Sequence, residues 1–293
     1  MSKCLAVAGA TGAVGTIVRQ LLEQRDLAVD RFKFLASKRS AGKTLTFRGQ
    51  SHTIEELGPD AFDDVDLVIG STPDDVAVDL VRWATEKNTL VIDESGAHRM
   101  LEHVPLVVPE VNPQAAALHR GVIASPNCST TQMVVAMKPL HDAATIRRVI
   151  VSTYQATSGA GVSGQQELLD ASRARLDQQP YSPTAFSHDI AFNCIPQIGS
   201  AKHEGYTSEE MKMVWETRKI LGDDTILVNP TAVRVPVFYG HGEAIHIETR
   251  VPIDAQDVKA LLAEAPGIKL YDDRDEFPTQ VCSASGNDLT HVG

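Results

Sequence analysis

The chain has 293 residues, 43% of them hydrophobic, which predicts a large core divided between two domains. Its formal net charge of -11 argues against nucleic acid or an anionic membrane as a partner, because either would require a basic surface. There is no apolar run long enough to span a bilayer, and the four cysteines are too widely spaced for a metal site. We therefore expect no metal, free thiols and a cytoplasmic location.

The N-terminal segment has the pattern of a dinucleotide-binding turn. A short apolar strand at residues 5–8 leads into a glycine-rich turn and then an amphipathic helix. Gly9 allows a tight turn, Gly12 lets the backbone approach a pyrophosphate, and Gly15 lets the helix pack close to the strand. The spacing is GxxGxxG, so a purely structural turn is the alternative. The expected cofactor contacts are Gly9, Thr11, Gly12, Ala13, Val14 and Gly15.

The next predicted strand, at residues 32–35, opens into a loop rich in hydroxyl and cationic side chains. An NAD site usually has an acidic residue near this place, whereas hydroxyls and cations suit the 2′-phosphate of NADP. Ser37, Arg39 and Ser40 are the expected contacts, so the loop favours NADP(H) over NAD. A solvated basic loop is the alternative.

Strands continue to alternate with helices through the first half of the chain. Strand-like runs occur at residues 66–69, 89–92 and 121–124, and a helix-like run at residues 76–85. This alternation predicts an α/β fold with a Rossmann-like, doubly wound parallel sheet, which binds ligands at the carboxyl ends of its strands. Ser71 and Thr72 follow one such end, and the loop that contains Arg99 follows another.

Cys128 lies where a loop turns into an apolar helix. Unpaired N–H groups and the positive end of the helix dipole favour a thiolate at such a position, and a thiolate attacks carbonyl carbon. We interpret Cys128 as a nucleophile, with a small packing cysteine as the alternative.

The pattern changes after residue 146. Long strand-like runs at residues 148–156, 225–236 and 244–251 predict a mostly antiparallel sheet in a second, α+β domain. We place the domains at residues 1–127 and 128–293. Arg234 lies within an apolar strand, where it must be paired, and this suggests an anion site. His241 lies in a glycine-flanked turn, as an acid/base or as an ordinary surface histidine.

A helix is predicted from Thr207 to about Leu221, with Thr207 and Glu210 spaced as a capping box. Glu209 and Lys212 lie on one face of this helix. On their own they indicate an exposed ion pair that contributes only a few tenths of a kcal/mol.

Several segments, in order along almost the whole chain, resemble the aspartate-β-semialdehyde dehydrogenase family. They are GATGAVG at 9–15, PLVVPEVN at 105–112, SPNCSTTQ at 125–132, YQATSGAG at 154–161, AFNCIPQIG at 191–199, EGYTSEEMKM at 204–213, ETRKILG at 216–222 and VRVPVFYGHGEA at 233–244. N-acetyl-γ-glutamyl-phosphate reductase is similar in architecture and chemistry, but its nucleophile has a glycine-cysteine-tyrosine setting. The Asn127-Cys128-Ser129 segment fits the aspartate enzyme better.

The resemblance implies NADPH-dependent reduction of L-4-aspartyl phosphate to L-aspartate 4-semialdehyde with release of phosphate, a step of lysine, threonine and methionine biosynthesis. It implies a homodimer formed through the second domain, which would be both the catalytic and the dimerisation domain. Cys128 would be the nucleophile that forms a thioester, His241 the acid/base, and Gln155 the residue that orients the acyl intermediate.

The resemblance also implies the substrate and cofactor contacts. Arg234 would bind the α-carboxylate and Glu209 the ammonium group, while the phosphate would be held by Arg99, Asn127 and Lys212. In the segment at 154–161, Ser158 and Gly159 are expected to contact the cofactor.

The chain departs from the family pattern in three places. Ser95-Gly96-Ala97-His98-Arg99 stands where Ser-Ser-Ala-Phe-Arg is expected. Thr72-Pro73-Asp74-Asp75 replaces a small glycine- and serine-rich loop, and its carboxylates weaken cofactor binding unless they point to solvent. The family continues for several tens of residues beyond the position of Gly293, and there we expect the rest of a strand and a long helix that this chain lacks.

Two alternatives stay open. One is a reductase of another acyl phosphate or acyl thioester, such as N-acetyl-γ-glutamyl phosphate. The other, motivated by the early C-terminus, is a truncated and inactive nucleotide-binding homologue.

Overall fold

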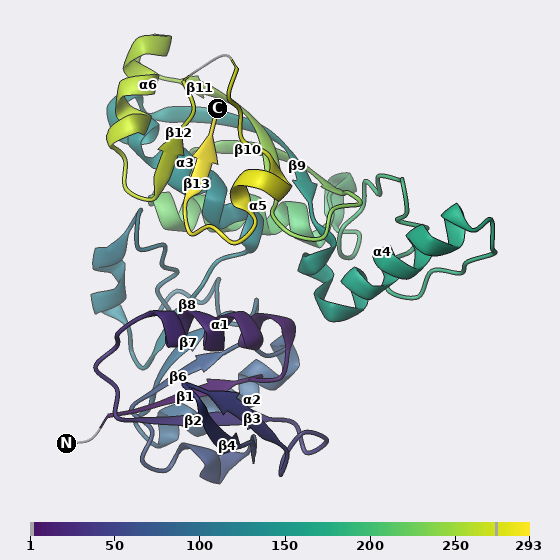
Figure 1. Cartoon of the computed structure of the whole chain (residues 1–293). Coiled ribbons are helices and arrows are strands. Elements are labelled where there is room, and N and C mark those ends of the chain that lie inside the picture. Colours follow the sequence, from purple (N-terminus) through teal and green to yellow (C-terminus); the bar gives the residue numbers. More distant parts are fainter. Residues whose placement is uncertain (1–2, 273–274) are drawn as a thin grey trace. The chain divides into compact units, whose positions relative to one another are not determined.

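The computed structural model describes residues 3–272 and 275–293 and divides the chain into two compact units (Figure 1). The first unit consists of Met1–Val107 and Pro113–Pro126, and the second of Val108–Asn112 and Asn127–Gly293. Each unit has its own sheet and its own hydrophobic core. Within the described residues, no helix combines the length and the apolar character needed to cross a membrane.

The first unit contains a sheet of six strands in the order β5-β2-β1-β6-β7-β8, with every neighbouring pair parallel. The strands are β1 (Cys4–Ala8), β2 (Arg31–Ala36), β5 (Glu55–Glu56), β6 (Leu67–Gly70), β7 (Leu90–Asp93) and β8 (Val122–Ala124). The order reverses beside β1, where β2 lies on one side and β6 on the other, and such switch points bind ligands in doubly wound sheets. The predicted parallel α/β sheet is confirmed.

Helices connect the parallel strands of this unit, because a parallel pair requires a long crossover. Helix α1 (Ala13–Gln24) joins β1 to β2, and α2 (Asp74–Glu86) joins β6 to β7. Two short 3-10 helices, η1 (Pro59–Phe62) and η2 (Pro113–Leu118), lie in other connections. A hairpin of β3 (Thr44–Phe47) and β4 (Gln50–Thr53) was not predicted, and its two turn residues both have positive φ.

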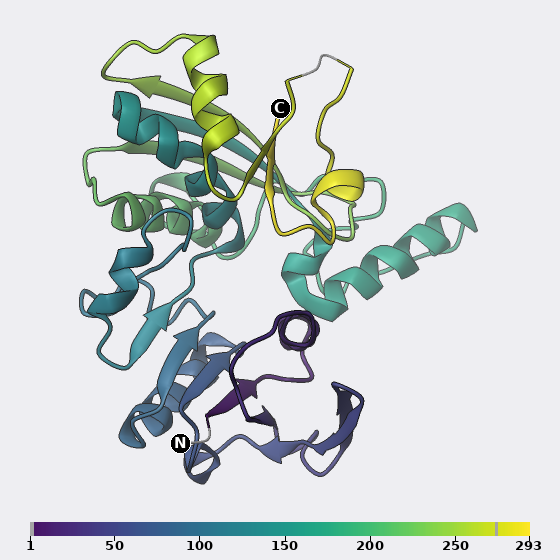
Figure 2. The same cartoon turned by 60° about the vertical axis from the view of Figure 1, so that its left-hand side comes forward.

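The second unit begins with α3 (Cys128–Ala144) and β9 (Ile146–Gln155). The remaining elements follow in chain order and are seen from two directions in Figures 1 and 2. They are η3 (Thr157–Ala160), α4 (Gly161–Leu176), η4 (His203–Gly205), α5 (Ser208–Leu221), β10 (Leu227–Arg234), β11 (Gly242–Thr249), α6 (Ala255–Glu264), β12 (Ile268–Leu270), η5 (Gln280–Ala284) and β13 (Thr290–Val292).

The main sheet of this unit has the order β10-β9-β11 and is mixed, whereas a mostly antiparallel sheet was predicted. Strand β9 pairs in parallel with β10 and antiparallel with β11. The connection from β9 to β10 contains α4 and α5, and this length allows the chain to re-enter the sheet in the same direction. A second, parallel pair is formed by β12 and β13.

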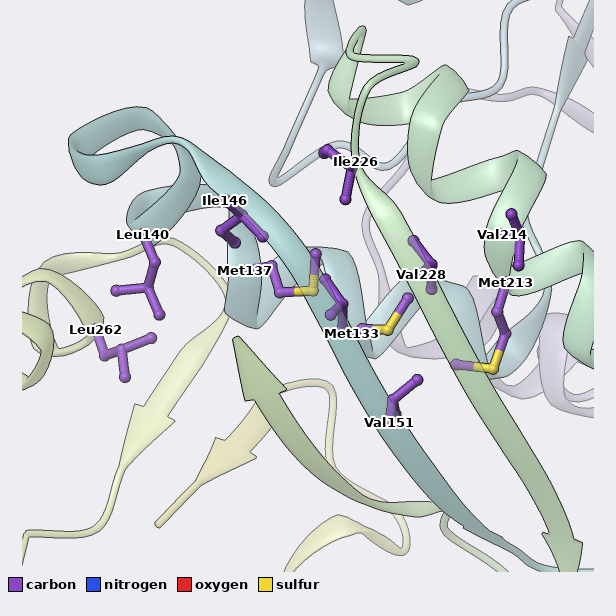
Figure 3. Close-up of a cluster of buried hydrophobic side chains, with 11 residues drawn as sticks. Met133, Met137, Leu140, Ile146, Val151, Met213, Val214, Ile226, Val228 and Leu262 are labelled. Atoms are coloured by element: carbon purple, nitrogen blue, oxygen red, sulfur yellow. The ribbon is translucent and has the colours of Figure 1, made fainter. Parts of the chain in front are cut away.

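One face of the mixed sheet is buried against α3 and α5 (Figure 3). The cluster contains Met133, Met137, Leu140, Ile146, Val149, Val151, Met213, Val214, Ile226, Val228 and Leu262. On the opposite face Ile150, Tyr154 and Leu227 are between 44% and 50% exposed. Because Met133 and Met137 are fully buried, the core holds α3, and thus its first residue Cys128, in a set position on the sheet.

Candidate active site

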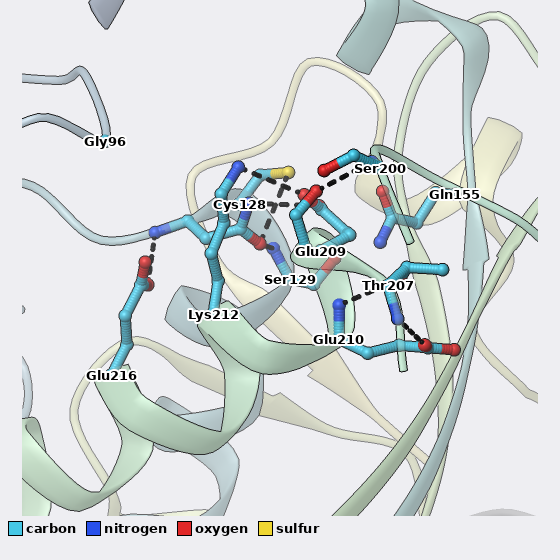
Figure 4. Close-up of polar contacts among 12 residues, drawn as sticks. Gly96, Cys128, Ser129, Gln155, Ser200, Thr207, Glu209, Glu210, Lys212 and Glu216 are labelled. Carbon is cyan, nitrogen blue, oxygen red and sulfur yellow. Dashed lines mark hydrogen bonds and ion pairs between the residues drawn. The ribbon is translucent and has the colours of Figure 1, made fainter. Parts of the chain in front are cut away.

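The first turn of α3 is fixed by the side chain and the backbone of Asn127 (Figure 4). Asn127 is the N-cap, and its Oδ1 accepts a hydrogen bond from the backbone N–H of Ser129 at 3.0 Å. Its own backbone N–H donates to Glu216 Oε2 at 2.7 Å. Cys128 is therefore the first residue of a capped helix, as the sequence predicted.

Helix α5 brings acidic groups to this helix start. The predicted capping box of Thr207 and Glu210 is present. Glu209 Oε1 accepts from Asn127 Nδ2 at 3.0 Å, and Glu209 Oε2 lies 3.3 Å from Lys212 Nζ. Glu209 is only 7% exposed, so the interpretation of Glu209 and Lys212 as an exposed surface pair is wrong. The helix face that carries them faces the nucleophile.

His241 lies directly against Cys128. Its Nε2 is 3.2 Å from the Cys128 Sγ, and its Nδ1 accepts a hydrogen bond from the backbone N–H of Ala156 at 3.0 Å. With Nδ1 as an acceptor, a neutral imidazole carries its proton on Nε2. The Nε2–H group therefore points at the sulfur as a donor.

The imidazole is neutral in the ligand-free site. Burial, followed by the nearby charge of Arg234, lowers the pKa of His241 to about 4. The hydrogen bond from the Ala156 N–H also favours the neutral imidazole, because a protonated Nδ1 cannot accept a hydrogen bond. A titration of His241 near neutral pH was expected and does not occur in this state.

The thiol of Cys128 is also neutral, against the expectation of a thiolate. Burial among protein atoms is the first cause that raises its pKa, to about 11, and the carboxylate of Glu209 is the second; Arg234 opposes both. The side chain is nevertheless exposed to solvent, which moderates the rise without changing its direction. A helix dipole contributes only about 0.3–1 kcal/mol, less than one pKa unit, and is outweighed here.

Arg234 is a buried cation without an anionic partner among the described residues. It is 6% exposed, its Nη1 donates to the carbonyl of Ala156 at 2.7 Å, and none of the described carboxylates lies within ion-pair distance. Burial lowers the pKa of its guanidinium, which shows the cost of leaving it unpaired. The buried guanidinium of Arg234 can therefore bind an anion, as the sequence suggested.

Gln155 and the turn that follows it also lie near Arg234 and His241. Gln155 is 1% exposed, and its Nε2 donates to Thr153 Oγ1 at 3.3 Å. At Gly159 an added Cβ would lie 2.8 Å from Arg234 Nη1, so a larger residue here would require the guanidinium of Arg234 to shift. Ser158 is held in the turn by its N–H, which donates to the carbonyl of Phe238.

The glycine turn of the first unit is tightly packed. Gly9 has a φ of +77°, and an added Cβ would lie 2.1 Å from the carbonyl oxygen of Ser71. A Cβ on Gly15 would lie 2.2 Å from the carbonyl oxygen of Gly9. Helix α1 starts at Ala13 without a side-chain cap from Gly12, so the first-turn N–H groups, which include that of Val14, suit a phosphate.

Hydroxyl and cationic groups surround this turn. Thr11 is exposed, and the Oγ1 of Thr72 is buried with no hydrogen-bond partner among the described residues, while Ser71 Oγ donates to Glu94 Oε2 at 2.5 Å. After β2, Ser37 and Arg39 are exposed, and Ser40 is buried and closes the turn through its N–H. No described residue forms an ion pair with Arg39. These groups fit a phosphorylated dinucleotide.

Two departures from the family pattern have structural explanations within the first unit. His98 forms a buried contact of 2.6 Å with Asp93, next to Arg99, whose Nη2 donates to the carbonyl of Glu94 at 2.8 Å. Asp74 Oδ1 accepts from the N–H of Gly96 at 2.7 Å. The Asp74 carboxylate is thus engaged by the loop that carries Arg99.

The second unit therefore brings together Asn127, Cys128, Gln155, Ser158, Gly159, Glu209, Lys212, Arg234 and His241. Arg99 and the other predicted cofactor residues belong to the first unit.

Sequence reasoning missed three residues near Cys128. Glu216 is 1% exposed and lies two helical turns after Glu209, a spacing that could have revealed it. Gln132 Nε2 donates to Glu243 Oε1 at 2.7 Å. Glu243 alternates with the core-facing Ile245, and that period could have placed it inside.

Comparisons with known proteins agree with this geometry. Residues 5–119 match the family model of the semialdehyde dehydrogenase NAD binding domain, and residues 137–293 match that of the semialdehyde dehydrogenase dimerisation domain. Aspartate-semialdehyde dehydrogenase of Shewanella sp. (strain DB6705) is 48% identical over 98% of this chain and 86% of its own length. Aspartate-semialdehyde dehydrogenase 2 of Vibrio cholerae is 47% identical over 99% of this chain and 86% of its own length.

Solved structures are similar as well. The crystal structure of aspartate semialdehyde dehydrogenase II from Vibrio cholerae complexed with ASA has a TM-score of 0.96 and 46% identity, and the match covers 99% of this chain and 86% of that one. Aspartate semialdehyde dehydrogenase with NADP from Candida albicans has a TM-score of 0.74 and 26% identity, over 96% of this chain and 85% of that one.

The raised pKa of Cys128 predicts its reactivity in the ligand-free protein. Alkylation by iodoacetamide, followed by peptide mass spectrometry, is expected to be slow at pH 7 and to rise about tenfold per pH unit toward about 11, because only the thiolate reacts. Glu209→Gln removes the neighbouring negative charge and is expected to speed alkylation several-fold at pH 8. Glu264→Gln, on the exposed end of α6, is the matched control. A wild-type plateau reached near pH 7 would contradict the neutral thiol.

Proposed function

The chain belongs to the aspartate-semialdehyde dehydrogenase family of oxidoreductases, enzymes of amino-acid biosynthesis, and we propose that it reduces L-4-aspartyl phosphate to the semialdehyde with NADPH and releases phosphate. The observation that carries this proposal is the pair of Cys128 and His241, 3.2 Å apart, beside the buried guanidinium of Arg234. A nucleophile, a hydrogen-bond donor and an anion site are what an acyl-transfer reaction of a small carboxylic acid requires.

The substrate is held by complementary charges. Arg234 pairs with the α-carboxylate, because no described carboxylate satisfies it. Glu209, buried next to Asn127, accepts the α-ammonium. Arg99, in the first unit, stays a predicted phosphate contact. Lys212 is the proposed phosphate contact of the second unit, whereas Asn127 already uses its Oδ1 and one Nδ2–H within the protein. We therefore assign Asn127 chiefly to holding Glu209 and the helix start.

Acyl transfer needs no separate base. The sulfur of Cys128 attacks the acyl carbon, the C–O bond to phosphate breaks, and the thiol proton leaves on the phosphate. The products are a thioester and hydrogen phosphate, so atoms and charge balance. A neutral resting thiol is compatible with this step, since the leaving group takes the proton. Gln155, at the end of β9, orients the thioester carbonyl.

Reduction places negative charge first on oxygen and then on sulfur. The cofactor, when bound, would supply the hydride for the thioester carbon. The Nε2–H of His241 donates a hydrogen bond to the resulting oxyanion, whose collapse expels the Cys128 thiolate and gives the aldehyde. The thiolate then takes a proton from water, because the raised pKa of Cys128 favours the neutral thiol. His241 acts here as a fixed donor, in place of the acid/base that the sequence suggested.

NADP(H) is the proposed form of the nicotinamide cofactor. Arg39 is exposed beside Ser37 and Ser40 and has no ion-pair partner among the described side chains, so it is available to a 2′-phosphate. The uncapped start of α1 and the buried Oγ1 of Thr72 fit the rest of a dinucleotide. A reaction that requires a reduced Cys128 also suits the cytoplasm.

The alternative substrate N-acetyl-γ-glutamyl phosphate fits less well. Its acetylated nitrogen is neutral, whereas Glu209 is a 7% exposed carboxylate that gains from a cationic ligand. The presence of the whole polar group around Cys128 argues against an inactive homologue.

The exposed face of the mixed sheet is the proposed contact between two copies of the chain. Ile150, Tyr154 and Leu227 expose large apolar side chains on strands whose opposite face is the core. The family model that covers this unit is a dimerisation domain. Exposed apolar side chains on a sheet face, here interspersed with polar ones such as Arg148 and Asn229, are compatible with an interface, so a second copy is the proposed occupant.

The activity is tested by phosphate-dependent reduction of NADP with L-aspartate semialdehyde. Purified wild-type protein is expected to turn over, and to use NADP better than NAD at equal concentration. Cys128→Ala is expected to lose the activity entirely, because no other described side chain can form the acyl intermediate. Turnover of N-acetyl-glutamate semialdehyde alone would favour the alternative substrate, and nucleotide binding without turnover would favour the inactive homologue.

The role of His241 as a donor predicts an order among its variants. His241→Gln keeps a side-chain N–H and is expected to retain more kcat than His241→Ala, which is expected to lose about 10²–10³-fold, as for removal of one oxyanion donor. The two kcat values are measured at pH 7 with saturating substrates. Equal losses in both variants would point to proton transfer, and so to the acid/base role.

The dimer face predicts an effect on association. Ile150→Asp places a charge at the centre of the face and is expected to shift the protein from dimer to monomer in sedimentation equilibrium. Leu176→Asp on α4, at a side chain that is 72% exposed, is the control and is expected to stay dimeric. A wild-type monomer, or an unchanged dimer in Ile150→Asp, would refute this face.

A further inference from the structure

Glu243 is a carboxyl group inside the second unit that the proposed reaction does not use. It lies on β11, opposite Thr153 of β9, and Thr153 is fully buried. Ile245, the next residue on the same side of β11, packs against the core. Glu243 therefore faces α3 from the buried side of the sheet.

Its two oxygens have different surroundings. Oε1 accepts a hydrogen bond from Gln132 Nε2 at 2.7 Å, while Oε2 is buried with no hydrogen-bond partner among the described residues. An ionised carboxylate in this place would have no cation to offset its desolvation. Burial raises the pKa of Glu243 to about 8, and the hydrogen bond from Gln132 opposes that rise. The group is therefore protonated at neutral pH.

The partner, Gln132, connects this carboxyl to the reacting pair. Gln132 lies one helical turn after Cys128 on α3, so both side chains are on the same side of the helix. Glu243 lies two residues after His241, just inside β11. The hydrogen bond between Gln132 and Glu243 thus joins α3, which carries the Cys128 sulfur, to β11, which follows the His241 imidazole. It lies within four residues of Cys128 and two residues of His241 along the chain.

We propose that Gln132 and Glu243 form a brace that holds the Cys128 sulfur and the His241 Nε2 at reacting distance. Both are positioning residues, since neither is in hydrogen-bond contact with either reacting atom. The inference rests on the proposed function, which makes this pair the centre of the chemistry.

The brace adds a connection to α3 beside the contacts that already hold His241, which include the pairing of β11 with β9 and the hydrogen bond of 2.7 Å from Gln280 Nε2 to the carbonyl of Gly240. The residue precedes β11 and is held by the N–H of Ala156 and by its contact with Cys128. A displacement of about 1 Å between reacting groups costs on the order of 10²-fold in rate. A second connection between α3 and β11 prevents the strand from shifting along the helix.

The protonation of Glu243 makes the brace dependent on pH. Among the described residues, the titratable groups nearest this region in sequence are Cys128 at the start of α3 and His241 before β11, and the neighbouring side chains on the buried face of β9 are Thr153 and Gln155. No charged group contributes to the pKa of Glu243. As the pH rises through about 8, Glu243 ionises without a cation. The hydrogen bond from Gln132 favours the ionised form but is outweighed by its desolvation, so the carboxylate is expected to move toward water and the brace to open.

Two variants test the brace through kcat. Gln132→Met keeps the length and removes the donor; its kcat is expected to fall about 10–100-fold, with KM for the semialdehyde and for phosphate within about twofold. Glu243→Gln keeps a neutral acceptor for Gln132; it is expected to retain wild-type kcat at pH 7 and to lose the decline in kcat near pH 8. Glu264→Gln is the matched control and is expected to keep that decline.

Two readouts do not depend on turnover. A buried carboxyl with a raised pKa contributes stability below its ordinary value of 4.5 and loses it as the pH rises toward about 8. The Tm of Glu243→Gln minus that of wild type is therefore expected to increase between pH 5 and pH 8. Alkylation of Cys128 at pH 7, where Glu243 is still protonated and the brace is closed in wild type, is expected to slow at least threefold in Gln132→Met, because the sulfur loses the imidazole N–H that stabilises its thiolate.

Opposite results overturn the brace. They are a wild-type kcat in a folded Gln132→Met, superimposable pH profiles for Glu243→Gln and wild type, or a Tm difference that does not change with pH. An inactive wild-type protein that still shows the expected Tm difference and alkylation change would instead remove the proposed reaction and leave the brace standing.

Discussion

The capped start of α3 is the constraint on which the second unit depends. The amide of Asn127 caps the helix with its oxygen and holds Glu209 with its nitrogen, while its backbone N–H is held by Glu216. These bonds join α3 to α5, and the fully buried Met133 and Met137 join α3 to the sheet. Cys128 is therefore placed by elements that are far apart in sequence, and its position depends on the core as much as on its neighbours.

This placement sets the electrostatics of the site. Two ionisable groups with shifted pKa values, Arg234 and His241, lie close to the thiol, and the thiol itself is the third. The pKa values of Arg234 and His241 are lowered and that of Cys128 is raised. Burial is the first cause in all three cases. The ligand-free site thus contains a buried guanidinium with no carboxylate partner among the described residues and a neutral thiol. An anionic ligand would offset the desolvation of this guanidinium.

Sequence patterns were sufficient for the fold class and for the positions of most strands of the first unit. Alternating apolar runs and the glycine turn gave β1, β2, β6, β7 and β8 within one or two residues, because period and turn chemistry are local. The mixed sheet was not predicted, since strand direction is decided by a long connection between β9 and β10. The neutral thiol was not predicted either: local rules report the helix start at Cys128, but not Glu209, which arrives from a distant helix. Strand alternation could have placed Glu243 on the buried face, but its hydrogen bond with Gln132 was not predictable, because that contact depends on how β11 packs against α3.

The solvent exposure of Cys128, together with its neutral state, has a consequence for oxidative damage. Peroxide reacts with the thiolate, so a thiol whose pKa is near 11 is a poor target even where water and small oxidants reach the sulfur. An exposed thiol of this kind is expected to resist peroxide at neutral pH. In the proposed reaction it is nevertheless reactive at that pH, because the phosphate leaving group takes the thiol proton.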